Sequence, residues 1–358
     1  MMPMAETPRS ADRAQLSFYV ENLLAAAQRT FDDEQQARRL GHTIQVYDRD
    51  ELAQFKAFWS SDRSDGGTSA RKVLQALEQR DPCWPCSPVP ADRALIELAD
   101  RFPNFAPAVD HVRRAAALAR LVPGGPLHLA PLLLNGPPGI GKSAFARAFA
   151  AALQAPLLQF SMTQATASFG LGGLNAQYSN GGPGYLVRSL VERGVPDAVV
   201  VVDELDKAAV DANHNPTLPL YELLEGSTAA RYVDDGLQMP LNLSGLRWIC
   251  TSNEAALIAE PLLSRCMQFQ IAAPTPEQMR AITATVYRDI VVAGNWAAHF
   301  DPELLPAVAE ELAESVPRDL TRVLRSALGA AALAGRSTIR VADLPTRLQS
   351  GRRRIGFA

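Results

Sequence analysis

Lysine and long apolar runs are scarce in this chain. Lysines and arginines together number 35, and only four of them are lysines: Lys56, Lys72, Lys142 and Lys207. The formal net charge of −3 gives no global basic field for nucleic acid and no acidic excess typical of a disordered tail. No 18-residue apolar run is free of charges and helix breakers, so we expect no transmembrane helix and no membrane partner. The N-terminus lacks the basic and apolar pattern of a signal peptide, so a cytoplasmic location is expected.

Cysteine is equally rare, with four in the chain. Cys83 and Cys86 form a Cys-x-x-Cys pair, but a structural zinc site needs two further ligands, and no second pair or paired histidine motif supplies them. A redox pair is an alternative, although no βαβ pattern surrounds it. We favour a proline-rich linker in a reducing cell, and we expect Cys250 to lie in the core because its strand is apolar.

Three regions differ in their pattern, and together they predict an α/β fold. Residues 1–105 are predicted to be mostly helical, with no motif that indicates a role. Residues 106–273 alternate short apolar runs with helical segments, which predicts a parallel sheet with helices on both faces. The continuous apolar run at 199–202 suits a strand buried on both sides. Residues 274–358 are predicted to form a small helical domain.

Local signals refine this division. In the first region, 16–31 has apolar residues at helical spacing, 43–47 resembles a short strand, and 81–92 resembles a stiff proline-rich connector. The third region opens on a helix start, with Thr275 as the N-cap and Pro276 at the first helical position.

A glycine-rich loop follows the apolar run 132–134 and opens an alanine-rich helix. Its glycines allow the backbone to approach a triphosphate, its lysine can reach the β- and γ-phosphates, and its serine hydroxyl can ligate Mg²⁺. We therefore predict that ATP binds here. The predicted nucleotide-binding residues are Gly136, Pro137, Pro138, Gly139, Ile140, Gly141, Lys142 and Ser143.

A second motif is the buried strand 198–202, which runs into a pair of carboxylates. Ligands of open α/β sheets bind at the carboxyl ends of the strands. Asp203 is therefore expected to hold Mg²⁺ through water, and Glu204 to orient and polarise the attacking water. For Asp206 we favour the simpler interpretation of an acid at a helix N-terminus.

With the phosphate loop, the acidic strand, the strand 246–253 and the helical tail in this order, the chain resembles the AAA+ superfamily of ATPases. Within it, the segment from about 131 to 328 most resembles the ATPase module of Lon proteases. The similarity rests on GPPGIGKS, VVVVDELDK, YELLEG, RYVDDGLQMPLNLS, LRWICTSN and EPLLSR. It implies an AAA+ P-loop sheet, a small C-terminal helical lid, and hydrolysis of ATP and water to ADP and phosphate.

The resemblance also assigns roles to three further residues. Asn253 matches the sensor-1 position, whose side-chain amide helps position the lytic water. Arg265 matches the arginine finger, which would reach the γ-phosphate bound by the neighbouring subunit. Arg318 matches the sensor-2 arginine of the lid, which contacts nucleotide within its own subunit. A finger acting between subunits implies a closed homo-oligomeric ring, in this superfamily usually a hexamer.

Tyr178 lies in the stretch Tyr-Ser-Asn-Gly-Gly-Pro-Gly, which matches the spacing of the Lon-like aromatic pore loop. A ring of such tyrosines could grip an extended polypeptide. The alternative is a glycine-rich loop with an incidental tyrosine.

Lon proteases continue beyond the lid into a Ser–Lys peptidase domain, whereas this sequence ends at Ala358, so we expect no intrinsic proteolysis. The leading hypothesis is a ring ATPase that remodels or translocates a protein substrate or partner complex. An alternative is an ATP-dependent switch or scaffold that recruits a separate effector, as in some bacterial defence or mobile-element systems. Nucleic-acid remodelling is a third possibility, supported only by the basic run 352–354.

Overall fold

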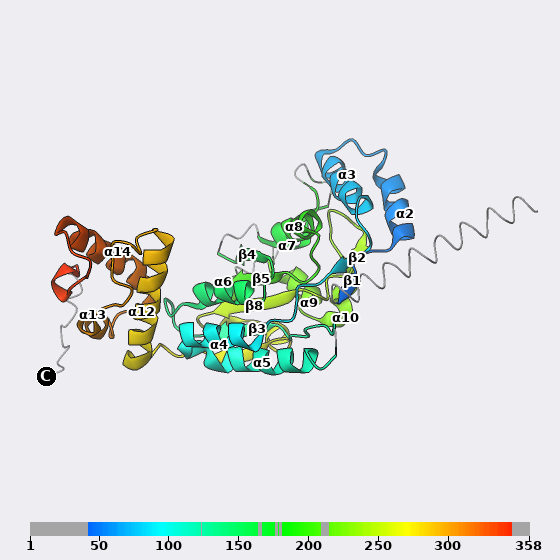
Figure 1. Ribbon diagram of the computed structural model, residues 1–358. Helices are drawn as coiled ribbons and strands as arrows, with labels where there is room; N and C mark the ends of the chain where they lie inside the picture. Colours follow the sequence, from blue (N-terminus) through cyan, green and yellow to red (C-terminus); the bar gives the residue numbers. More distant parts are fainter. Residues whose placement is uncertain are drawn as a thin grey trace, which may run out of the picture.

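The structure analysed is a computed structural model of the chain (Figure 1). The residues it describes are 42–122, 124–163, 167–175, 178, 181–208 and 215–345. The predicted helix at 16–31 and the basic run at 352–354 lie outside them. In Figure 1 a central sheet with flanking helices carries α2 and α3 at one end and the helices α12 to α14 at the other.

The central sheet has five strands in the order β4-β5-β8-β3-β9, and every neighbouring pair is parallel. These strands are β3 (Leu132–Asn135), β4 (Leu157–Ser161), β5 (Val199–Asp203), β8 (Arg247–Ser252) and β9 (Met267–Gln270). The register pairs Val202 with Cys250 and Leu134 with Thr251, so the carboxyl ends of β5, β8 and β3 meet at one edge. The predicted α/β fold with a parallel sheet is confirmed.

Helices cover both faces of this sheet. Leu133, Val200 and Cys250 belong to one hydrophobic cluster, whereas Leu132 and Val199 belong to another, as expected when successive strand residues face opposite sides. The second cluster includes residues of α4 (Asp92–Arg101), η1 (Pro103–Phe105), α5 (Ala106–Ala119) and α6 (Lys142–Ala152). The first includes residues of α7 (Ala167–Gly172), α8 (Tyr185–Arg193) and α9 (Leu218–Leu223). Cys250 is fully buried, as predicted.

The phosphate-loop helix is packed against the segment that precedes the sheet. Phe105 of η1 stacks on Phe145 of α6 with ring centroids 4.4 Å apart, and both side chains are fully buried. Thus α4 and η1 share a core with α6, although the sequence pattern led us to place residues 1–105 outside the ATPase unit.

Replacing Phe105 by Ala should therefore destabilise the ATPase unit rather than a separate N-terminal domain. Loss of a buried phenylalanine costs about 3–5 kcal/mol, because a cavity is left. Urea unfolding followed by circular dichroism measures the change. Phe58→Ala removes a side chain that is 59% exposed and should cost about 1 kcal/mol or less. Equal losses in the two variants would contradict this packing.

The segment before α4 contains two helices and a small sheet. These elements are β1 (Thr43–Gln45), α2 (Arg49–Trp59), α3 (Asp65–Glu78) and β2 (Cys83–Pro85). β2 pairs antiparallel with β1, so that Trp84 lies opposite Ile44 and is buried in the core. We predicted that the proline-rich stretch 81–92 is a connector, but part of it forms a strand. Burial of Trp84 holds this part in place, and Pro85 is the last residue of the strand.

Shorter elements link β5 to the lid. They are η2 (Leu205–Lys207), α10 (Gly226–Ala229), β6 (Tyr232–Val233), β7 (Pro240–Leu241), η3 (Ala255–Leu257) and α11 (Glu260–Leu263). β6 and β7 pair antiparallel.

The C-terminal helices form a separate hydrophobic cluster. They are α12 (Pro276–Ala293), α13 (Pro306–Glu311), α14 (Pro317–Leu333) and η4 (Val341–Asp343). Thr275 caps α12 as predicted: its hydroxyl accepts from the backbone N–H of Gln278, whose side chain accepts from the backbone N–H of Thr275.

Candidate functional site

The loop between β3 and α6 has the backbone conformation that its glycines predict. Gly141, the residue before α6, has φ of 103°, a region that residues with a side chain rarely adopt. A Cβ on Gly136 would overlap the carbonyl oxygen of Ile271, so the loop passes against the end of β9. These two positions bring the backbone to the N-terminus of α6, where a helix offers unpaired N–H groups to an anion.

Lys142, the first residue of α6, lies inside this loop and is 9% exposed. Its ammonium group donates to the carbonyl oxygens of Gly136 (2.6 Å) and Pro137 (3.0 Å) and to Oδ1 of Asn253 (2.9 Å). Burial lowers the pKa of Lys142, and nearby carboxylates, Asp206 foremost, oppose that shift. The structure thus brings Asn253, at the end of β8, directly to the loop lysine.

The acidic end of β5 meets the same helix. The hydroxyl of Ser143 donates to Oδ2 of Asp203 at 2.8 Å, and the hydroxyl of Thr251 donates to Oδ1. Glu204 has a left-handed backbone, with φ of 58° and ψ of 50°, and its N–H donates to the Thr251 hydroxyl at 3.1 Å. A non-glycine residue in that region is uncommon and is often found at functional sites.

Two features near this edge were not predicted from the sequence: the contacts of Thr251 and the burial of Asp206. Thr251 holds both Asp203 and the backbone of Glu204, and the signal that could have revealed it is the alignment of β8 beside β5. Asp206 lies in the first turn of the short helix η2, as we expected of a helix acid, but its burial was not predicted. Its side chain is fully buried, its oxygens accept no hydrogen bond from the part of the chain that is described, and it lies 3.6 Å from Lys207.

A cavity of about 720 Å³ joins these residues to the lid. Arg318 of α14 lines it, and its backbone N–H donates to the carbonyl of Gly139 at 3.2 Å. Arg101 and Asp289 form an ion pair of 2.5 Å between α4 and α12 at the same cavity. The predicted site residues that line this cavity are Pro138, Gly139, Ile140, Gly141, Lys142, Ser143, Asp203, Glu204, Asn253 and Arg318.

Arg265 is not among them. It lines a different cavity, of about 1170 Å³, together with residues that precede β3 and begin β8, at the opposite edge of the sheet. One guanidinium nitrogen donates to the carbonyl of Pro261 at 2.6 Å, and the group lies 5.9 Å from the ring centroid of Tyr221. Within one chain, Arg265 is therefore separated from the phosphate loop.

Tyr178 also lies away from the phosphate-loop cavity and is 64% exposed. Its N–H donates to the carbonyl of Asn175 (3.1 Å), and its own carbonyl accepts from Gly181 (2.8 Å). The residues beside it, 176–177 and 179–180, are outside the described part of the chain.

Among the described residues, no group of three or more His, Cys, Asp or Glu is placed to hold a metal ion. In the same part of the chain, no helix is long and apolar enough to cross a bilayer.

The sequence of this chain is similar to those of known ATPases. Residues 132–274 match the family described as ATPase family associated with various cellular activities (AAA). The mitochondrial Lon protease homolog of Drosophila melanogaster is 32% identical over 151 residues, which are 42% of this chain and 15% of that protein. Lon protease 4 of Sorangium cellulosum is 30% identical over 192 residues, which are 53% of this chain and 23% of that protein.

Among solved structures, two mutant forms of RuvB from Thermotoga maritima align with TM-scores of 0.40 and 0.41 at 16% identity. Each alignment covers 65% of this chain, and 67% and 66% of the respective RuvB chains.

The parallel sheet with flanking helices and the glycine-rich loop between β3 and α6 are together typical of a P-loop α/β domain. Residues 132–274 are similar to an AAA ATPase domain, and the similarity to the two Lon proteases covers 42% and 53% of this chain. The chain spans less than a quarter of the length of these two relatives, 15% and 23%.

Proposed function

We propose that the chain hydrolyses ATP in the cavity between the phosphate loop and the lid. The observation that best supports this proposal is that α6, β5 and β8 come together at one place. There the Ser143 hydroxyl donates a hydrogen bond to Asp203, and the Lys142 ammonium donates one to Asn253. A buried cation at a helix N-terminus provides the charge that a triphosphate requires. Lys142 exchanges its carbonyl partners for phosphate oxygens when ATP binds.

The donor set at the end of β5 fits a magnesium ion. The Ser143 hydroxyl and the Asp203 carboxylate are oxygen donors 2.8 Å apart, and oxygen is the ligand that Mg²⁺ prefers. Ser143 and Asp203 would hold the ion, which would supply positive charge to the bound phosphates. Thr251 fixes the orientation of the Asp203 carboxylate.

Glu204 is the residue that polarises the attacking water. It follows Asp203 directly, and the hydrogen bond from its N–H to Thr251 fixes the left-handed turn that carries it. Asn253 lines the same cavity and positions the water beside Glu204. Arg318 contacts the nucleotide from the lid, since its own backbone is bonded to the phosphate loop.

Arg265 completes the site of a neighbouring subunit. Because Arg265 lies away from the phosphate loop of its own chain, the γ-phosphate that it can reach is the one bound by a second copy of the chain. A head-to-tail contact of this kind closes into a ring. We propose a homo-oligomeric ring, in the first instance a hexamer.

The work done by this ring is the remodelling of a protein substrate or partner, gripped by Tyr178. Support comes from the exposure of that side chain and from the similarity to the Lon ATPase region. The division proposed for the chain is an N-terminal region at 1–105, an α/β ATPase unit at 106–273 and a lid at 274–358, with α4 packed on the ATPase unit.

Tyr178→Ala should abolish a response to unfolded protein. We expect β-casein, an unfolded polypeptide, to stimulate ATP turnover of the wild-type chain and to have no effect on this variant, because the exposed ring is the gripping group. Phosphate release with and without β-casein is the measurement. Leu333→Ala, which truncates a lid side chain that is 94% exposed, should keep the stimulation. Stimulation that survives in Tyr178→Ala, or is missing in the wild type, would instead favour the switch or scaffold.

A further inference from the structure

A buried carboxylate lies close to the loop that carries Tyr178. Asp234, in the turn between β6 and β7, is 1% exposed. Its Oδ1 accepts from the N–H groups of Gly236 and Leu237, and its Oδ2 accepts from the N–H of Gly184, each at 2.9 Å. Two of these bonds shape the turn itself. The third reaches across to the residue before α8, so Asp234 joins two segments distant in the sequence.

The segment bonded by Oδ2 is the closing end of the Tyr178 loop. Leu174 and Gly182 form an antiparallel bridge, with N–H to carbonyl distances of 2.9 and 2.6 Å. A Cβ on Gly173, whose φ is 74°, would overlap the Asp234 carboxylate, and one on Gly236 would overlap the carbonyl of Gly182. The turn and the loop base are therefore packed backbone against backbone, without space for a side chain between them.

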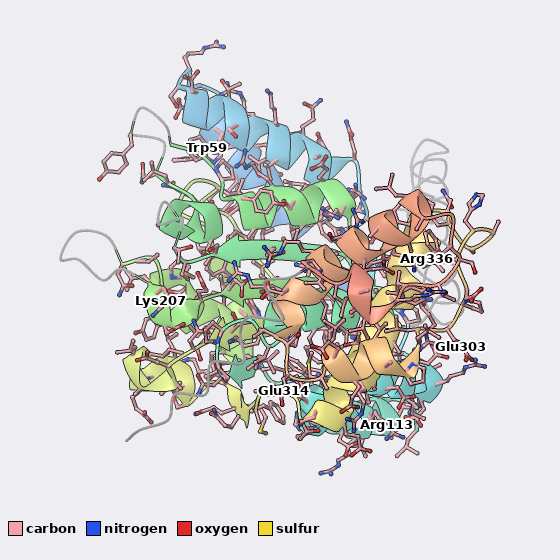
Figure 2. All side chains as sticks on the ribbon, turned by 90° about the vertical axis from the view of Figure 1, so that its left-hand side faces the viewer. Trp59, Arg113, Lys207, Glu303, Glu314 and Arg336 are labelled. Atoms are coloured by element: carbon pink, nitrogen blue, oxygen red, sulfur yellow. The ribbon has the colours of Figure 1, made fainter. Side chains whose placement is uncertain are left out.

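The N-terminal helices close the same contact from the other side. Trp59, the last residue of α2, is 2% exposed, and its indole N–H donates to the carbonyl of Leu237 at 3.0 Å. A Cβ on Gly182 would stand 3.4 Å from Cβ of Ser69 in α3, so α3 lies directly against the bridge. Figure 2 labels Trp59 where the blue N-terminal helices meet the green segment of α7 and α8.

We propose that α2, α3 and the Asp234 turn form a socket that fixes the base of the Tyr178 loop, with Asp234 and Trp59 as positioning residues. In this proposal the function of α2 and α3 is to fix the position of Tyr178. This inference rests on the proposed function, since it is the gripping role of Tyr178 that gives the position of the loop its importance.

The chemistry of Asp234 suits an anchor. Burial raises its pKa to about 7, although the three backbone N–H bonds oppose that shift. A buried carboxylate that loses one of its partners is strongly disfavoured, so the bond to Gly184 resists separation of the loop from the turn. The neighbouring Asp235 is exposed, and its backbone N–H donates to the carbonyl of Gly172, at the end of α7, at 2.8 Å.

Asp234→Asn tests the socket. The amide keeps an oxygen for Gly236 and Leu237 but turns an NH₂ group toward the N–H of Gly184, so only the bond to the loop is lost. We expect hydrogen–deuterium exchange at pH 8 in peptides covering Leu174 and Gly182 to accelerate about tenfold or more, while exchange in α6 and α14 stays as in the wild type.

Two further variants make the result specific. Asp235→Asn makes the same change of charge one residue away and should leave exchange at the bridge unchanged. Trp59→Phe keeps the aromatic bulk, removes the N–H, and should accelerate the bridge severalfold. Unchanged exchange in both Asp234→Asn and Trp59→Phe would overturn the socket, as would a uniform acceleration over the whole chain.

The same proteins separate the socket from the gripping role. Faster exchange at the bridge together with a loss of β-casein stimulation supports both. Faster exchange with full stimulation supports the socket and contradicts gripping by Tyr178, so failure of the proposed function is distinguishable from failure of this inference.

Discussion

Glu204→Gln should bind ATP as the wild-type chain does and hydrolyse it at least about 10²-fold more slowly. General-base assistance contributes about 10²–10⁴-fold to reactions of this kind, and an amide cannot polarise water as a carboxylate does. The change keeps the shape of the side chain and leaves the backbone bond from Glu204 to Thr251 in place. Binding of a fluorescent ATP analogue and release of phosphate measure the two properties separately.

The matched control for this variant is Glu222→Gln, because Glu222 is an exposed carboxylate of α9 outside the phosphate-loop cavity. It should retain wild-type turnover. Wild-type turnover in Glu204→Gln would mean that another group activates the water, and loss of ATP binding would mean that Glu204 supports the fold of the loop.

Arg265→Ala should also stop hydrolysis while ATP binding persists, with a loss of about 10³-fold or more if Arg265 acts as an arginine finger. This expected loss would not follow from the structure of one chain, because Arg265 lines a different cavity from the phosphate loop of its own chain. With ATP binding intact, an effect of that size would place Arg265 at the nucleotide of another subunit. Turnover measured over a range of protein concentrations gives the test.

Arg93, an arginine whose side chain is 90% exposed on α4, provides the control for the change of charge. Arg93→Ala should keep wild-type turnover at every concentration. If Arg265→Ala also hydrolyses ATP normally, the site is complete within one chain and the shared site is wrong.

The sequence carried enough information to predict the sheet and most of the candidate site. Spacing alone placed Ser143 at the start of a helix and Asp203 at the end of a strand, and parallel strands bring such ends to one edge. The bond between these two side chains follows from that placement. Asn253 and Arg318 came from the resemblance to AAA+ ATPases, and both line the cavity in which Lys142 lies.

What the sequence did not reveal depends on which segments become neighbours. Thr251 lies within the LRWICTSN stretch, but nothing in that stretch indicates its role, and it gains its partners because β8 lies beside β5. Asp206 looks like an ordinary helix acid until the fold buries it. The strand at Cys83–Pro85 is hidden by prolines, and burial of Trp84 outweighs their local preference. The contact of Trp59 with Leu237 joins residues 178 positions apart, which no local pattern can predict.

Mixing two inactive variants tests most directly whether the site is shared between subunits. Lys142→Ala removes the ammonium of the phosphate loop but keeps Arg265, whereas Arg265→Ala keeps the loop. In mixed rings, verified by native mass spectrometry, random assortment gives about a quarter of the junctions an intact loop facing an intact Arg265. We predict that each variant alone is inactive and that the mixture hydrolyses ATP. A mixture that forms mixed rings and stays inactive would contradict the shared site.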